Sequence, residues 1–168
     1  MQKLAILVSD ASGFSRRTHE YGILQFLAAM TYCYDRLKPL ITRGNGLCLS
    51  RNVDNGDNLI AIFADPVEAV QTAINMQLWL RKYNQRRLEA EQFNMCIGIA
   101  WGPALRLKHD IFGDKVNMAA KIGEDMASKD EILVTQEVAN HVKGRFPREY
   151  ARSTHIGGRH VELYRVRY

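Results

Sequence analysis

Two aspartates, Asp10 and Asp57, are the residues of this sequence whose type and position best suit chemistry. Asp10 follows the apolar run 5–8 and precedes a Ser-Gly-Phe turn at 12–14, and Asp57 follows a glycine and precedes the apolar run 59–63. A strand that ends in a tight turn leaves backbone N–H groups able to face an anion. A carboxylate beside them repels a bare anion, so a divalent cation that binds both carboxylate and phosphate resolves the conflict. The alternative is that Asp10 only ends a strand and Asp57 only closes a hairpin.

The elements that must position this pair follow from the hydrophobic pattern of the first hundred residues. The order is strand, helix, strand, strand, helix, strand. Pro39 is expected to end the first helix and Gly102-Pro103 the last strand, and Asp65-Pro66 is a typical helix start. The expected bounds are 3–9, 17–38, 47–53, 58–63, 65–88 and 95–101.

This order predicts an α+β fold with a ferredoxin-like βαββαβ core, in which two helices cover one face of an antiparallel sheet. Strands 3–9 and 58–63 become central antiparallel neighbours, so the end of one lies beside the start of the other. Asp10 and Asp57 then converge, and two convergent carboxylates either share a proton or bind cations. Their hard oxygen ligands suit two divalent ions, Mg²⁺ or Mn²⁺.

The rest of the chain is expected to extend this core within a single domain, residues 1–168. A helix at 112–127, a strand at 131–135, a helix at 136–143 and a hairpin at 149–166 around Gly157-Gly158 complete the pattern. This gives the core a C-terminal helix and hairpin extension.

Composition limits the classes of function. The chain has 168 residues, 46% of them apolar, and a net charge of +5 from 23 Lys and Arg against 18 Asp and Glu. This mild excess favours anionic ligands but is too small to indicate nucleic acid. No run approaches the roughly 18 apolar residues of a membrane helix, and no signal-peptide layout precedes Asp10. Cys33 and Cys96 are expected to be reduced core thiols, which favours the cytoplasm, and the five His residues do not cluster along the sequence.

Three segments carry a resemblance to a known family: LVSDASGFSRRT, GDNLIAIFADPVEAV and DIFGDKVNMAAKIGED. In this order and spacing the chain resembles a class III adenylate and guanylate cyclase catalytic domain, from about Lys3 to Tyr168. The resemblance implies that a nucleoside triphosphate closes to a 3′,5′-cyclic monophosphate and releases pyrophosphate. It implies that Asp10, Asp57 and the backbone carbonyl of Ala11 hold two divalent cations. It also implies that Ser12, Gly13, Phe14 and Ser15 cover the phosphates.

The third segment is expected to supply the rest of the site. Asn117 and Lys121 are four residues apart on a helix and therefore share a face. By the resemblance, Asn117 orients the ribose and Lys121, where Arg is common, stabilises the transition-state charge. Asp110 matches the position that accepts a hydrogen bond from the adenine amino group, which favours ATP. The alternatives are that Asn117 is a capping or surface residue, that Lys121 is a solvated helix charge and that Asp110 is a helix cap before Phe112.

Two positions depart from the family pattern. Val53 stands where adenylate cyclases often carry a base-reading Lys, with Arg51 nearby, and Arg159 is the candidate nearest to the Lys often found in the final hairpin. Base identity and triphosphate affinity therefore stay open. The alternatives are a cyclase for GTP or a pyrimidine nucleotide, a catalytically degenerate module that binds a nucleotide or a partner, and a ferredoxin-like RNA binder.

The resemblance further implies a site built across a head-to-tail dimer, with the metal aspartates from one protomer and Asp110, Asn117 and Lys121 from the other. One chain contains both halves, so a homodimer is expected. Family members usually join this domain to a sensor. Both a domain of a longer protein and a small enzyme regulated by partners fit the sequence.

Overall fold

The structure is a computed structural model that describes residues 1–49, 58–108 and 110–168. In the described residues the first part of the chain has the expected order of elements. These are β1 (Gln2–Ala11), α1 (Phe14–Tyr21), α2 (Ile23–Arg43), β2 (Leu47–Cys48), β3 (Leu59–Phe63), α3 (Pro66–Asn84) and β4 (Met95–Arg106), with the short helix η2 (Glu89–Glu91) before β4.

The C-terminal part adds a second set of elements to this core. They are β5 (Ile111–Phe112), α4 (Asp114–Lys121), the π-helical turn η3 (Ile122–Met126), β6 (Ile132–Thr135), α5 (Gln136–His141), β7 (Arg148–Ile156) and β8 (Arg159–Val166). The hairpin β7–β8 turns at Gly157-Gly158, as the sequence predicts.

The described strands form one mixed sheet in the order β2-β3-β1-β4-β6-β8-β7, with β5 paired to the end of β4. The β4–β6 pair is parallel and the other pairs are antiparallel. The first four positions have the ferredoxin-like order, so the predicted fold class is confirmed. β1 is central, as expected, between β3 and β4.

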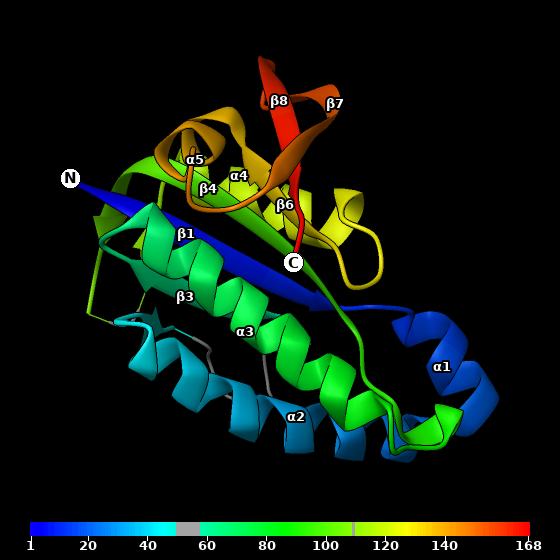
Figure 1. Cartoon of the computed structure of the whole chain (residues 1–168). Helices are drawn as coiled ribbons and strands as arrows, with labels where there is room; N and C mark the ends of the chain where they lie inside the picture. Colours follow the sequence, from blue (N-terminus) through cyan, green and yellow to red (C-terminus); the bar gives the residue numbers. More distant parts are fainter. Residues whose placement is uncertain (50–57, 109) are drawn as a thin grey trace.

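Helices cover both faces of this sheet. α2 and α3 lie side by side along one face (Figure 1), where Leu37, Ala73 and Leu7 belong to one apolar cluster. α4 packs on the opposite face, where Met118 and Ile122 share a second cluster with Ile6 and Val8 of β1. Successive residues of β1 thus enter alternate clusters, because side chains of a strand alternate between its faces.

Two glycines allow α4 and η3 to approach the sheet closely. A Cβ at Gly98 of β4 would lie 2.5 Å from the carbonyl oxygen of Ala119, and a Cβ at Gly123 of η3 would lie 2.7 Å from that of Val8. Neither position has room for a side chain. The helix that carries Asn117 and Lys121 is therefore set directly on the backbone of β1 and β4.

The expected helix 17–38 is wrong in its bounds. Gly22, with φ 86° and ψ 151°, separates α1 from α2, and α2 continues through Pro39 to Arg43. Leu37 and Ile41 are fully buried on either side of Pro39, which is itself exposed. Burial of these residues outweighs the hydrogen bond that proline removes.

Two further boundaries are corrected. β4 does not end at Gly102-Pro103, because Gly102 pairs with Leu4 and Pro103 with Lys3, and the strand runs on to Arg106. The expected helix 112–127 is α4 followed by the π-helical turn η3. The expected strand 47–53 is described only as β2, since residues 50–57 lie outside the described residues.

The cysteine prediction is confirmed. All three cysteines are free, and Cys33 and Cys96 are buried. Burial raises the pKa of the Cys33 thiol to about 12. Among the described residues, none of the helices combines the length and apolar character that a bilayer crossing requires.

Candidate active site

Asp10 lies at the end of β1, where the central strand leaves the sheet. It pairs with Cys96 of β4 and is half-buried, and its neighbour Ser9 pairs with Leu59 at the start of β3. Burial, with a smaller contribution from the charge of Asp10, raises the pKa of the Cys96 thiol to about 11. The carboxylate of Asp10 is thus placed at the edge of the core, as the sequence predicts.

The loop after Asp10 leads directly into α1. The backbone N–H of Ser12 donates to the carbonyl of Asn94, 2.9 Å away, so this group is already engaged. Gly13 has φ 76° and precedes α1 without a side-chain cap. The first N–H groups of a helix have no intrahelical acceptor, so those of residues 14–16 are the ones suited to an anion. The ring of Phe14 packs edge-on against Phe26 at a centroid distance of 5.0 Å, which anchors the loop.

Arg17, two residues after this loop, has a structural role. Its side chain is 6% exposed, and its guanidinium donates to the carbonyls of Glu89 and Gln92 at 2.8 and 2.5 Å. Arg17 therefore ties α1 to the segment before β4. Arg16 is exposed and forms an ion pair with Glu20 at 3.1 Å.

Asn117 and Lys121 lie one turn apart on the exposed side of α4, as their spacing predicts. The ammonium group of Lys121 forms an ion pair with Asp125 at 2.8 Å, and both side chains are more than half exposed. The hydrogen bond and charge of Asp125 raise the pKa of Lys121 above its ordinary value. Within the described part of the chain, Asp125 is the ion-pair partner of Lys121, and this exposed pair is weak because solvent screens it.

Asp110 and Arg159 lie near the other end of α4. The carboxylate of Asp110 accepts from the N–H of Ile111 at 2.9 Å, and its carbonyl accepts from Leu107. α4 begins after Gly113, so Asp110 does not cap this helix. Arg159 forms an exposed ion pair with Asp114 at 2.9 Å, which draws the tip of the β7–β8 hairpin to the start of α4.

The structure keeps Asp10 and Asp110, one residue from each half of the predicted site, apart within one chain. Asp10 is opposite Cys96 at the start of β4, and Asp110 is bonded to Leu107, one residue beyond the end of β4. At about 3.3 Å per residue, this length of strand places Asp110 on the order of 30 Å from Asp10. One protomer therefore cannot bring both to a single nucleotide.

The donors near Asp10 fit a hard divalent cation in chemistry. Asp10 offers carboxylate oxygens, and the predicted second donor, the Ala11 carbonyl, is adjacent to it at the strand end. Within the described residues, no group of three or more His, Cys, Asp or Glu is placed to hold a metal ion. The predicted site depends also on Asp57, which lies outside the described residues together with Arg51 and Val53.

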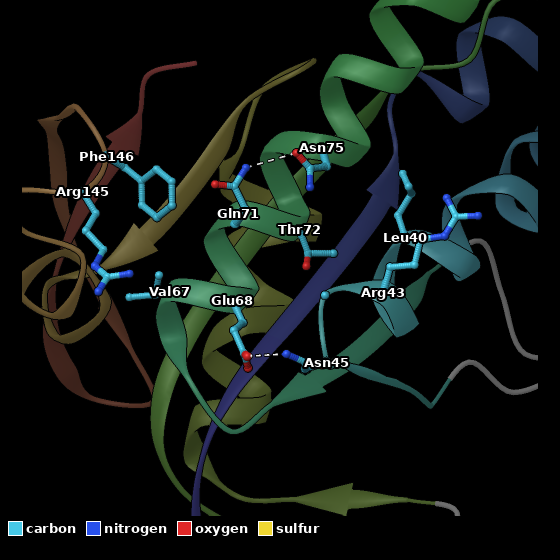
Figure 2. Close-up of a pocket in the computed structure, with 11 residues that line it drawn as sticks. Leu40, Arg43, Asn45, Val67, Glu68, Gln71, Thr72, Asn75, Arg145 and Phe146 are labelled. Carbon is cyan, nitrogen blue, oxygen red and sulfur yellow. Dashed lines mark hydrogen bonds between the residues drawn. The ribbon is translucent and has the colours of Figure 1, made fainter.

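A separate cavity of about 700 Å³ lies over α3, between the end of α2 and the turn after α5 (Figure 2). Four of its polar side chains form two hydrogen-bonded pairs: Asn45 donates to Glu68 at 2.7 Å and Gln71 to Asn75 at 3.1 Å. None of the predicted site residues lines it. The cavity is therefore not the site that the sequence predicts.

Two of the histidines lie together in the structure, which the sequence analysis did not predict. His155 and His160 are cross-strand partners in the β7–β8 hairpin, with ring centroids 5.5 Å apart. This pairing could have been predicted from the sequence, because a two-residue turn at Gly157-Gly158 makes residues 155 and 160 cross-strand partners.

Comparison with known proteins places this geometry in a family. The sequence model of the family "Adenylate and Guanylate cyclase catalytic domain" matches residues 1–167 of this chain. "Putative adenylate cyclase 3" of Rhizobium meliloti (strain 1021) is 27% identical over 158 residues, which cover 94% of this chain and 26% of that protein. The chain thus spans about a quarter of the length of this relative.

Solved structures share the fold. The adenylyl cyclase CyaB from P. aeruginosa superposes with a TM-score of 0.82 at 19% identity, over 99% of this chain and 94% of the other. A non-canonical dimeric guanylyl cyclase domain of the RhoGC fusion protein, from the aquatic fungus Blastocladiella emersonii, gives 0.80 at 16% identity, over 99% and 96%. The chain belongs to the class III adenylate and guanylate cyclase catalytic domain family.

Proposed function

We propose that this protein is a class III cyclase that converts ATP to 3′,5′-cyclic AMP and pyrophosphate at the interface of a homodimer. The observation that carries the proposal is the exposure of Asn117 and Lys121 on one side of α4, in a chain of the cyclase family. Both side chains are available to a ligand that a second protomer presents.

In this proposal the phosphates are held at the end of β1. Asp10, Asp57 and the carbonyl of Ala11 would hold two divalent cations, Mg²⁺ or Mn²⁺. These ions would neutralise phosphate charge and lower the pKa of the ribose 3′-hydroxyl. The loop Ser12–Ser15 would cover the phosphates with backbone N–H groups at the start of α1.

The α4 side of the second protomer would complete the site. The amide of Asn117 orients the ribose by hydrogen bonds, and the ammonium of Lys121 stabilises the charge that develops on the α-phosphate. Lys121 must exchange Asp125 for the phosphate, and an exposed ion pair costs at most about 1 kcal/mol to break. Arg159 would likewise leave Asp114 to contact the triphosphate.

Asp110 favours adenine over guanine. An ionised carboxylate accepts hydrogen bonds but cannot donate one, so it suits the adenine amino group and not the guanine carbonyl. Cytosine also has an amino group, so this argument separates ATP from GTP better than from CTP.

A homodimer is supported by the surface around Asp110. Leu105 and Phe112 pair across β4–β5 and are 48% and 51% exposed, and Leu107 is 51% exposed. Three large apolar side chains beside a predicted base-binding residue form a surface suited to a protein interface. The separation of Asp10 from Asp110 within one chain also supports a site shared between two protomers.

Product analysis tests the reaction. The purified protein is incubated with ATP, GTP, CTP or UTP, with Mn²⁺ and then Mg²⁺, and cyclic products are identified by mass spectrometry. We expect cyclic AMP from wild-type protein and none from Asp57→Ala. A different cyclic nucleotide would refute the role of Asp110, and no cyclic product with any nucleotide would refute the enzyme.

Mixing inactive variants tests the shared site. Asp10→Ala and Asn117→Ala remove opposite halves, so each is expected to be inactive alone. In a random mixture, half of the dimers are mixed and each regains one intact site, so about a quarter of wild-type activity should return. Activity that fails to return, or a wild-type enzyme that is active as a monomer in sedimentation, would contradict the dimeric site.

The second candidate is a cyclase-like module that binds a nucleotide or a partner without turnover. The ion pairs Lys121–Asp125 and Arg159–Asp114 favour it, because they occupy both predicted phosphate-binding cations. Nucleotide binding without product by wild-type protein and by Asp125→Ala would support this alternative. We further propose that residues 1–168 act as one catalytic domain in the cytoplasm, under the control of a regulatory domain or protein.

A further inference from the structure

The tip of the β7–β8 hairpin holds two imidazoles in a fixed register. Gly157 and Gly158 both have positive φ, 57° and 76°, which is the backbone of a tight two-residue hairpin turn. His155 and His160 are therefore directly opposite, one pair away from the turn. Register is well specified here, because Ile156 and Val161, which flank the two histidines, are buried in the same apolar cluster as Met118 of α4.

Alternation along the strands places the histidines on the outer face. Ile156 and Val161 point to the core, so His155 and His160 point away from it, and both are exposed. Their ring centroids are 5.5 Å apart, with the rings inclined at 71°. Neither imidazole makes a hydrogen bond or ion pair within the described residues, so their ring nitrogens are available to an external ligand.

We propose that His155 and His160 form a binding site for Zn²⁺ on the outer face of the β7–β8 hairpin. Zinc binds imidazole nitrogen at about 2.0–2.1 Å, and a tetrahedral ion brings its two nitrogens to about 3.3 Å from each other. Directly opposite Cβ atoms on a hairpin are about 5 Å apart, so rotation of two exposed rings reaches this separation.

The rest of the coordination shell is water. The described residues offer no third His, Cys, Asp or Glu in a metal-binding group, so the site is open and exchangeable. Glu162 lies on the same face two pairs further from the turn, and its carboxylate accepts from the hydroxyl of Tyr164 at 3.2 Å. Imidazole ligands favour Zn²⁺ over Mg²⁺, so this site differs in chemistry from the carboxylate site at Asp10.

Zinc at this position would fasten the two strands at the tip of the hairpin. Arg159 is next to His160 and points to the other face, where it contacts Asp114. A metal bridge between the strands would therefore restrict the backbone that carries Arg159. Binding itself does not depend on the cyclase reaction, and it is measured without nucleotide.

Calorimetric titration with ZnCl₂ tests the proposal on the full chain, purified without a histidine tag and in excess Mg²⁺ to occupy carboxylate sites. The variants are His155→Ala, His160→Ala and, as a matched control, His19→Ala, which removes an exposed histidine from α1. We expect one zinc ion per chain, at least tenfold weaker binding in each hairpin variant and unchanged binding in the control. Absence of zinc binding by wild-type protein, or equal binding by the hairpin variants, would overturn the proposal.

An NMR measurement identifies the ligands independently of affinity. Long-range ¹H–¹⁵N spectra of the imidazoles should show one nitrogen of His155 and one of His160 shifting on addition of zinc, while those of His19 and His141 do not move. In parallel, the midpoint of thermal unfolding should rise with zinc in wild-type protein and not in the double variant. A zinc response confined to other histidines would refute the assignment.

Discussion

The contact between η3 and the sheet gives the sharpest test of how this fold positions its site. In Gly123→Ala, the new Cβ would lie 2.7 Å from the carbonyl oxygen of Val8 and 3.2 Å from the backbone nitrogen of Gly98. Both are backbone atoms of buried strands and cannot rotate away. Ordinary contact begins at 3.4 Å, so η3 must move from β1 by about 0.7 Å.

The expected cost follows from this overlap. Added methyl groups in a packed interior cost about 1–3 kcal/mol, and the gain in helix propensity over glycine returns at most about 1 kcal/mol. We expect a net loss of about 2 kcal/mol in the free energy of unfolding, which leaves a protein of ordinary stability folded. The shift also moves Lys121, two residues earlier, and displacements near 1 Å cost up to about a hundredfold in rate. Under the proposed function, activity should fall about tenfold or more.

Gly144→Ala is the matched control. A Cβ there meets no atom within 4 Å, but φ is 82°, so the substitution costs about 1–2 kcal/mol through backbone strain alone. Both variants are compared by urea denaturation and by cyclic nucleotide production at a temperature where both are folded. The control should lose stability without losing activity. Wild-type stability in Gly123→Ala, or full activity of its folded fraction, would refute the reasoning.

Three other predictions concern buried or paired groups. Arg17→Met leaves the backbone carbonyls that Arg17 binds without their donor, so we expect the free energy of unfolding, measured by urea denaturation, to fall by about 2–3 kcal/mol. A decrease below about 0.5 kcal/mol would contradict the structural role of Arg17. Burial holds the Cys33 thiol protonated, so iodoacetamide at pH 8 should modify Cys48 first, as read by peptide mass spectrometry, and faster labelling of Cys33 would contradict the packing. Hydrogen bonds from Arg167 and Arg165 hold the pKa of Glu149 below its ordinary value. This stabilisation is present above the pKa of Glu149 in the unfolded chain and is lost as the pH falls through the pKa in the folded protein. Glu149→Gln should therefore lower the free energy of unfolding at pH 7 and change it little at pH 3. An equal loss at both pH values would refute this role of Glu149.

Local signals predicted much of the fold because local chemistry decides those positions. Asp65 was expected to cap α3, and its carboxylate accepts from the N–H of Val67 at 2.8 Å. Pro39 shows the limit of such signals. Its local preference is to end a helix, but fully buried Leu37 and Ile41 on either side extend α2 past it. A local pattern cannot weigh a lost hydrogen bond against burial that depends on distant residues.

The candidate site was predictable to a different degree at each residue. Asp10 could be placed, because the apolar run before it stops where the strand leaves the core. The ion pair of Lys121 with Asp125 could have been predicted from their spacing of four residues on a helix. The pairing of His155 with His160 could likewise have been predicted from the two-residue turn between their strands.

No pattern in the sequence predicts on which face of the sheet α4 packs. The apolar stripe of α4 shows that one of its faces is buried, but an amphipathic helix fits either face of a sheet. Here Gly98 and Gly123 have no room for a side chain, and these two residues let α4 rest on the face opposite α2 and α3. The strand β4 then separates Asp110 from Asp10 by its whole length. A site that uses both must draw them from two protomers, so the activity of this chain should fall on dilution as the dimer dissociates.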